Sequence, residues 1–116
     1  MLALGLMMAQ SAVATIVLPV PLPEPAQRAV SIYQNCLFDA IDEQDRRRAW
    51  SEREVLSSCT GVRGAQYGEA IARLNEAGWS VASSRRRVRQ RFAELDESVW
   101  TIVGHARARH GRRVID

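Results

Sequence analysis

The chain has 116 residues, a length that suits a single domain. Hydrophobic residues make up 47% of it, which excludes an intrinsically disordered chain, whereas only 6% are aromatic and much of the apolar content is alanine. This balance favours a thin helical hairpin or bundle over a thick core. The net charge is +3, and all 16 basic residues are arginine, as is typical of a high-GC genome, so the arginine content alone does not indicate phosphate binding.

Residues 1–14, MLALGLMMAQSAVA, are apolar and end in a small-x-small sequence that signal peptidase accepts. The segment lacks the basic residues that usually begin a signal peptide. Two alternatives are an uncleaved membrane anchor running to about Leu22 and a buried cytosolic segment. We expect a signal peptide over residues 1–14 and a periplasmic or secreted protein.

Four prolines alternate with other residues in residues 15–25. Because proline cannot occupy a helix interior and favours the extended polyproline II conformation, we expect a stiff spacer between the signal peptide and the domain. A polyproline ligand for a partner protein is the alternative.

A first helix is predicted over residues 26–48, because its apolar residues recur at spacings of three and four. These residues are Ala26, Ala29, Val30, Tyr33, Cys36, Leu37, Ala40 and Ile41. Its end carries the favourable i,i+4 pairs Asp42–Arg46 and Glu43–Arg47, each stabilising by about 0.2–0.5 kcal/mol. Three consecutive arginines then suit the negative end of the helix dipole.

A second helix is predicted to begin at Ser51, after a short turn. Ser51 and Glu54 have the spacing of a capping box, in which the hydroxyl accepts from the N3 amide and the carboxylate returns to the cap amide. Trp50 and Val55 occupy the positions of a hydrophobic staple. Such a short connection joins antiparallel helices and makes a hairpin.

The two cysteines, Cys36 and Cys59, lie on either side of this turn. At about 1.5 Å per helical residue their heights on the hairpin differ by roughly 6 Å, which a modest tilt absorbs. A disulfide requires Cα atoms within about 7 Å, so we expect Cys36 to bond Cys59. The alternatives are free thiols, or zinc ligands that would need His105 or His110 from a remote segment.

The second helix is predicted to bury Val55, Leu56, Cys59 and Val62. Past the second cysteine, Gly61, Gly64 and Gly68 share a helical stripe. Each glycine in a helix interior costs about 1 kcal/mol relative to alanine. Two explanations stay open: close approach of another helix over the small residues, or a weak or kinked stretch.

From Tyr67 onward apolar residues recur at alternating spacings of four and three, a heptad-like period typical of a coiled coil that would also allow oligomerisation. In the last part this seam comprises Val88, Phe92, Leu95, Val99, Ile102 and Ala106. Either one helix runs to about Arg109, or Gly78 ends a helix and a third begins near Ser83 or Ser84. We favour the break, and expect an all-α domain over residues 26–110, a hairpin extended by a long or third helix, with a frayed tail over residues 111–116.

A helix with Tyr33 and Cys36 in a Tyr-x-x-Cys pattern, an acidic turn and a second helix with Cys59 resembles small, uncharacterised exported two-cysteine helical proteins of high-GC bacteria. The resemblance covers roughly residues 26–77 and rests on a short motif. It implies a helical, disulfide-bonded periplasmic protein and no particular activity.

The sequence contains no Walker A, G-x-S-x-G, H-E-x-x-H or C-x-x-C motif. His105 and His110 are five residues apart, so on a helix they do not share a face as metal ligands. The acidic residues Asp39, Asp42 and Glu43 are more typical of a solvated helix end than of an acid–base pair. We therefore expect no enzyme, no metal and no cofactor.

The sharpest functional signal is the run Arg85, Arg86, Arg87, Arg89 and Arg91. Nine arginines fall between residues 85 and 113, against Glu94, Asp96 and Glu97. Such a stripe is either a solvated helix face or a surface for an anionic membrane, cell-wall polymer or acidic partner. Nucleic acid is disfavoured, because no aromatic residue interrupts the run. On a helix, Arg87 and Arg91 would lie beside the apolar seam, with Arg107 beside its far end.

These features together predict a non-enzymatic exported helical protein, a structural or interaction module in the cell envelope. The alternative is a cytosolic Arg-rich nucleic-acid-binding protein. The two differ in compartment, and hence in whether the cysteines are oxidised.

Overall fold

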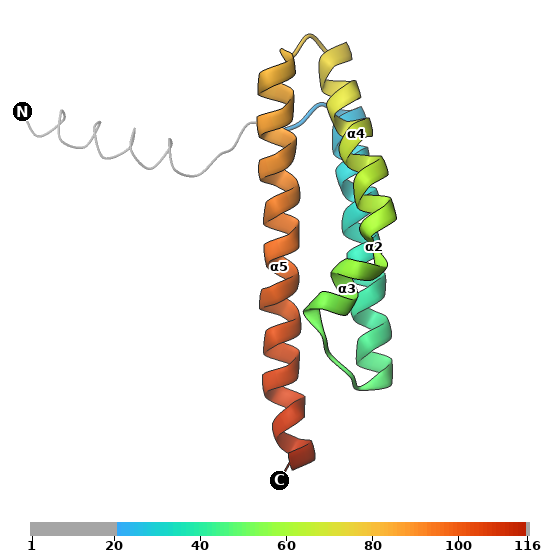
Figure 1. Ribbon diagram of the computed structural model, residues 1–116, viewed down its shortest axis with the longest axis vertical. Helices are drawn as coiled ribbons and strands as arrows, with labels where there is room; N and C mark the ends of the chain where they lie inside the picture. Colours follow the sequence, from blue (N-terminus) through green and yellow to red (C-terminus); the bar gives the residue numbers. More distant parts are fainter. Residues whose placement is uncertain (1–20, 116) are drawn as a thin grey trace, which may run out of the picture.

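The computed structural model describes residues 21–115, with side chains as far as His110, and this part of the chain forms four helices and no strand (Figure 1). They are α2 (Glu24–Arg47), α3 (Glu52–Ser58), α4 (Thr60–Glu76) and α5 (Val81–Ile115). α2 descends in the view of Figure 1, α3 and α4 return beside it, and α5 descends again alongside both. The expected all-α hairpin with a third, long helix is confirmed. The expected signal peptide, and the spacer as far as residue 20, lie outside the described residues.

α2 begins at Glu24, two residues earlier than expected, so Glu24 and Pro25 belong to the helix and not to the spacer. Pro25 lies in the first turn, where its missing N–H has no intrahelical partner to lose and its fixed φ suits a helix. Leu22 is already buried in the core. The helix ends at Arg47, and Arg48 follows in the left-handed conformation at φ 60°, with its N–H directed to the carbonyls of the last turn.

The expected N-cap at the bend is confirmed, but the reciprocal half of the capping box is wrong. The Ser51 hydroxyl accepts from the Glu54 amide at 3.2 Å. The Ser51 amide, however, donates to the side-chain oxygen of Gln44 at 3.0 Å, and the Gln44 amide group donates to the Ser51 carbonyl at 2.9 Å. Gln44 is 1% exposed and satisfies both backbone groups at once. Glu54 is thereby left to pair with Arg47, 3.4 Å away.

The expected disulfide between Cys36 and Cys59 is confirmed, with Cα atoms 6.1 Å apart. The predicted single helix from Ser51 is wrong, because the helix divides into α3 and α4 at Cys59. Side-chain hydroxyls compete for the backbone here: Ser58 donates to the carbonyl of Val55 at 2.9 Å, and Thr60 to that of Leu56 at 3.2 Å. Such back-bonding bends helices, which accounts for the division.

The explanation that another helix closely approaches the glycine stripe is wrong. A Cβ atom added at Gly61, Gly64 or Gly68 would meet no atom within 4 Å, and all three residues are exposed. The remaining explanation, a weak helical stretch, fits their position just after the division at Cys59. α4 instead packs through Ala70 and Leu74, which are fully buried.

The break at Gly78 is confirmed. Gly78 has φ +96°, in the region that favours glycine, and the N–H groups of Gly78 and Trp79 donate to the carbonyls of Asn75 and Leu74. This pairing is a Schellman motif. α5 begins at Val81, before the expected Ser83 or Ser84, because Ser80 is the N-cap and accepts from the Ser83 amide at 3.1 Å.

The seam of α5 packs against the hairpin as expected, except at one position. Val88, Phe92, Leu95, Val99 and Ala106 are buried. Ile102 is 41% exposed, and Val103 is buried in its place. A straight helix has 3.6 residues per turn, so the buried stripe drifts from a strict heptad and a spacing of four replaces the expected three.

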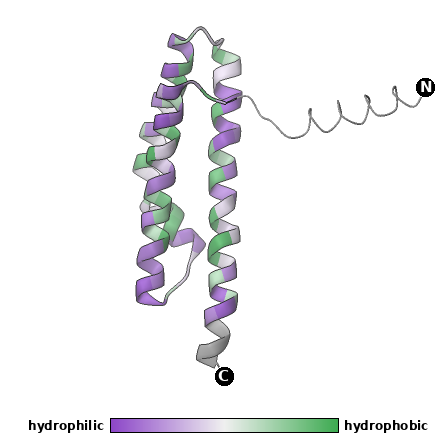
Figure 2. Cartoon of the chain, turned by 180° about the vertical axis from the view of Figure 1, so that it is seen from behind, coloured by the Kyte–Doolittle hydropathy of each residue, from purple (hydrophilic) through white to green (hydrophobic). Residues whose placement is uncertain are grey.

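The inner sides of the helices carry the hydrophobic residues, whereas the end of α2 beside the bend is hydrophilic (Figure 2). α5 continues to Ile115, so residues 111–115, which we expected to be frayed, are helical. No helix among residues 21–115 is both long and apolar enough to cross a lipid bilayer.

Replacing both cysteines, as Cys36→Ala/Cys59→Ala, should lower the free energy of unfolding by about 2–4 kcal/mol, since the bond closes a loop across a separation of 23 residues. The urea midpoints of the variant and of the reduced wild-type chain should fall by similar amounts relative to the oxidised wild-type chain. An unchanged midpoint in both would contradict a stabilising role for the disulfide.

Candidate functional site: the arginines at the start of α5

The five arginines expected to contact an anionic partner occupy two flanks of α5. Arg87 and Arg91, one turn apart, are half-buried on the flank that faces the start of α2. Arg85 and Arg89, also one turn apart, are exposed on the opposite flank, since residues advance by about 100° each around a helix. Arg86 is exposed on the outer side. The structure therefore confirms that Arg87 and Arg91 border the seam, but it does not bring all five to one face.

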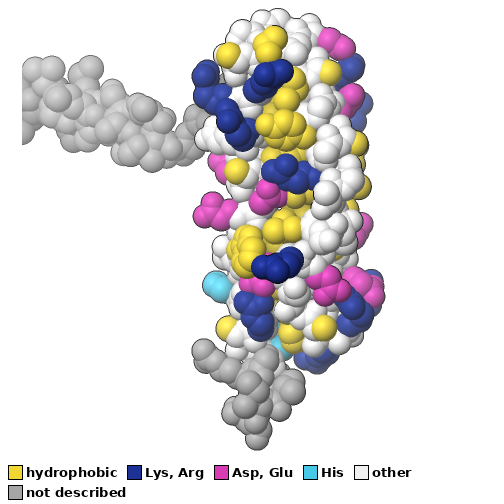
Figure 3. Space-filling model, viewed as in Figure 1, with side chains coloured by type: hydrophobic (Ala, Val, Ile, Leu, Met, Phe, Trp, Pro, Cys, Tyr) yellow, Lys and Arg dark blue, Asp and Glu magenta, His cyan; other side chains and the backbone are white. Residues whose placement is uncertain are grey.

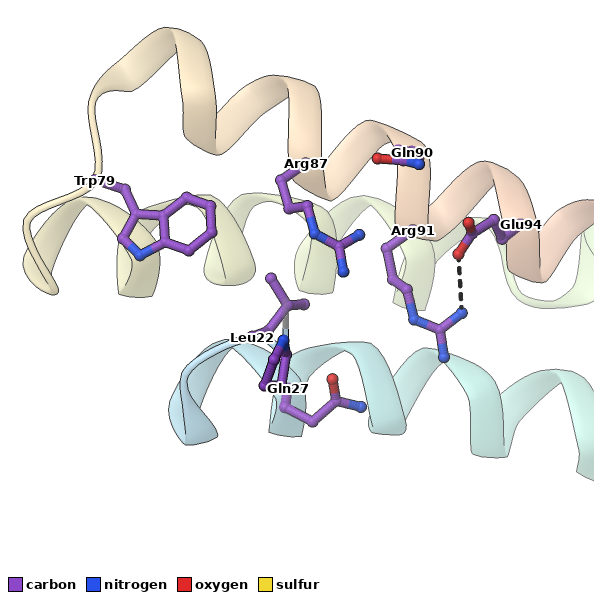
Figure 4. Close-up of a pocket in the computed structure, with 8 residues that line it drawn as sticks. Leu22, Gln27, Trp79, Arg87, Gln90, Arg91 and Glu94 are labelled. Atoms are coloured by element: carbon purple, nitrogen blue, oxygen red, sulfur yellow. Dashed lines mark hydrogen bonds and ion pairs between the residues drawn. The ribbon is translucent and has the colours of Figure 1, made fainter. Parts of the chain in front are cut away.

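A groove of about 750 Å³ lies between α5 and the start of α2. Its walls combine cationic, amide and apolar side chains from three segments that are distant in the sequence. They are Pro21, Leu22, Gln27, Trp79, Arg87, Gln90, Arg91 and Glu94. In Figure 4 the side chains of Arg87 and Arg91 extend from α5 toward α2, with Leu22 below Arg87 and Trp79 at one end.

The positive charge at this site is only partly compensated. Arg91 pairs with Glu94 at 3.4 Å within the groove. Arg85 and Arg89 have no hydrogen bond or ion pair with any residue in the described range 21–115. Arg86 makes only a long contact of 3.5 Å with the Ser83 hydroxyl. The uncompensated charge is therefore on the exposed flank and outer side, where an anion in solution would reach it first.

A second cluster, which no sequence motif indicated, joins three helices through one carboxylate. Arg63 of α4 donates to both oxygens of Asp96 of α5, at 2.7 Å from Nη2 and at 3.1 and 3.3 Å from Nε. The hydroxyl of Tyr33, from α2, donates to the same carboxylate. One available signal was Tyr33 itself, because a buried tyrosine hydroxyl requires a partner.

The guanidinium of Arg63 is surrounded by aromatic rings. Its Cζ atom lies 5.6–5.9 Å from the ring centroids of Tyr33, Tyr67 and Phe92, within the range of cation–π attraction. Tyr33 stacks on Phe92 with centroids 5.1 Å apart, and Tyr67 meets Phe92 edge-on at 5.3 Å. Burial and the hydrogen bond to Asp96 raise the pKa of Tyr33 well above its usual value, so its hydroxyl stays protonated and continues to donate.

A third polar contact joins α5 to α3, far along α5 from the groove. Arg107 of α5 donates to both oxygens of Glu52 at 2.6 and 2.7 Å, and Glu52 is 7% exposed. These hydrogen bonds lower the pKa of Glu52 and keep it ionised. This contact agrees with the prediction that Arg107 lies beside the far end of the seam. Glu52 was not predicted as its partner. A bidentate pair of this kind serves to orient α5 on α3.

The acidic residues of the first helix form a solvated helix end, with Asp39, Asp42 and Glu43 all exposed. The expected pair Glu43–Arg47 is present at 3.8 Å, but Arg46 bonds Glu43 rather than Asp42. The hydrogen bond from Arg46 lowers the pKa of Glu43.

The two histidines lie apart in the structure. His105 is exposed, whereas the ring of His110 stacks on Trp50 with centroids 5.1 Å apart. Within residues 21–115, no three His, Cys, Asp or Glu side chains gather in a way that would hold a metal ion. Comparison with protein families, curated proteins and solved structures finds no match to this chain.

The cluster around Asp96 should make a measurable contribution to stability. Asp96→Asn keeps the shape but leaves the Arg63 guanidinium without a charged partner. Since the two side chains are 36% and 26% exposed, we expect a loss of about 1–2 kcal/mol in urea unfolding, less than for a fully buried pair. Glu97→Gln, an exposed neighbour on the same helix, is the matched control and should change little. Equal effects of the two substitutions would show that the cluster does not hold α5 in place.

Proposed function

We propose that this protein is a non-enzymatic, exported helical module that binds an anionic polymer of the cell envelope through the arginines at the start of α5. The observation that carries the proposal is the exposed pair Arg85 and Arg89, which have no partner among the described residues. Arg86 lies beside them, and Arg87 and Arg91 border a groove on the other flank. A flexible polymer with a negative charge on each unit can reach both flanks of one helix at once.

Export is supported by the disulfide, because such bonds form and persist in oxidising compartments. It is also supported by the apolar segment at residues 1–14, which ends in a sequence suited to signal peptidase. Both observations concern the compartment of the protein, whereas the proposed partner is inferred from the arginines.

A polymer is favoured over a bilayer surface, because a helix that lies in a membrane interface needs a free apolar face. The apolar seam of α5 packs against the hairpin, with Phe92, Val99 and Val103 essentially inaccessible. Contact with a membrane would then be electrostatic alone, and physiological salt would weaken it strongly.

A cytosolic nucleic-acid-binding protein is the second candidate, since the same arginines could contact phosphates. The oxidised cysteines disfavour it. We expect the intact mass of the natively expressed protein to correspond to loss of residues 1–14 and two hydrogens fewer for the disulfide. A mass that retains Met1, with free thiols, would favour the cytosolic alternative. An intact apolar segment on a membrane-extracted protein would favour an anchor.

Binding to a soluble polyglycerol phosphate can be compared by titration calorimetry with binding to phosphatidylglycerol vesicles and to a 20-nucleotide DNA duplex. We expect the polymer to bind at physiological salt and Arg85→Gln/Arg89→Gln to weaken it about tenfold or more, through loss of two phosphate contacts. The control is Arg48→Gln/Arg109→Gln, which removes the same charge from two exposed arginines elsewhere.

Equal losses in the two double variants would mean that only net charge matters, and would contradict a site at the start of α5. Tighter binding to DNA than to the polymer would favour the second candidate. Vesicle binding that persists at physiological salt would show that the membrane itself is the partner.

A further inference from the structure

A second concave surface lies beside the Arg63–Asp96 cluster, between α3–α4 and α5. This Trp100 pocket has a volume of about 370 Å³. One wall is a stripe along α3 and α4 at spacings of three and four, and the other consists of two α5 residues one turn apart. The first wall contains Arg53, Leu56, Thr60 and Arg63, and the second Asp96 and Trp100.

Trp100 is the most unusual feature of this surface. Its side chain is 51% exposed, although tryptophan is highly buried on average. Leu56, on the facing wall, is half-buried and packs on the core. Exposed tryptophan beside arginine in a concavity has the composition of the energetic centre of protein–protein interfaces. Figure 3 shows hydrophobic side chains running between α5 and the hairpin, with basic side chains interleaved among them.

The charges of the pocket indicate the chemistry of its ligand. Asp96 is neutralised by Arg63 and accepts from Tyr33, so it presents no free charge. Arg53 is exposed and has neither an ion pair nor a hydrogen bond within the described part of the chain. The pocket therefore offers one uncompensated cation at its rim, next to an apolar surface.

The walls are held in position before any ligand arrives. Thr60 directly follows Cys59, which the disulfide ties to α2, and the bidentate Arg63–Asp96 contact fixes the distance between α4 and α5. A preorganised site loses less conformational entropy on binding.

We propose that the Trp100 pocket docks an acidic segment of a partner protein, in which an aromatic or aliphatic side chain is adjacent to a carboxylate. The apolar side chain rests on Trp100 and Leu56, and the carboxylate pairs with Arg53. A second copy of this chain is disfavoured, because a two-fold contact through this pocket would place two uncompensated Arg53 side chains in one small interface. The site shares no residue with the polymer-binding arginines, so either proposal can fail without the other.

Selection from a random heptapeptide display library against the full oxidised domain tests this proposal. We expect a consensus with Asp or Glu next to an aromatic or aliphatic residue. In calorimetry with the synthetic consensus peptide, Trp100→Ala should weaken binding about tenfold or more, and Arg53→Gln should weaken it severalfold. Ile102→Ala and Arg109→Gln, at exposed positions that do not line this pocket, are the matched controls and should leave affinity unchanged.

Trp100→Ala and Arg53→Gln alter exposed side chains, and thermal unfolding of each should match that of the wild-type chain. No consensus, a consensus without an acidic residue, or equal affinity for Trp100→Ala and Ile102→Ala would overturn the proposal. Sedimentation equilibrium of the chain alone adds one outcome: a dimer abolished by Trp100→Ala would show that a second copy covers the pocket and would also overturn it.

Discussion

One carboxylate, that of Asp96, joins α5 to both long helices of the disulfide-bonded hairpin. Asp96 accepts from a guanidinium on α4 and from a tyrosine hydroxyl on α2, so all three long helices meet at one side chain. A partly buried carboxylate needs such partners, because an unpaired charge away from water is strongly unfavourable. Arg63 in turn lies among three aromatic rings, of which Tyr33 and Phe92 belong to the core and Tyr67 packs against it. Polar and apolar packing therefore reinforce each other at the same point, and the register of α5 on the hairpin follows from it.

Both candidate surfaces depend on that register. The start of α5 presents Arg85 and Arg89 to solvent because the opposite side of the helix is buried in the seam. The Trp100 pocket exists because Trp100 is one turn beyond Asp96, and the contact with Arg63 holds that turn next to the α3–α4 stripe. Two candidate surfaces of different chemistry thus depend on how α5 is placed against the hairpin: one is basic and open, and the other is apolar with a cationic rim.

Two groups of arginines in this chain have different physical roles. Arg63 and Arg107 make bidentate contacts to carboxylates and tie α5 to the hairpin. Arg85, Arg89 and Arg53 have no partner among the described residues. Composition cannot separate these groups, since all 16 basic residues of the chain are arginine. The distinction lies in which residues reach a carboxylate, and therefore in the tertiary structure.

Local chemistry in the sequence determined the helical class, the bend with its cap at Ser51, the break at Gly78 and most of the buried seam, because each depends on residues within a few turns of one another. The pairing of Cys36 with Cys59 followed from counting along two antiparallel helices. Only the tertiary structure decided that Gln44 rather than Glu54 completes the cap, and that Asp96 joins Arg63 and Tyr33. These outcomes bring together side chains up to 63 residues apart, and no local spacing records which distant partner a polar group will meet once the helices pack.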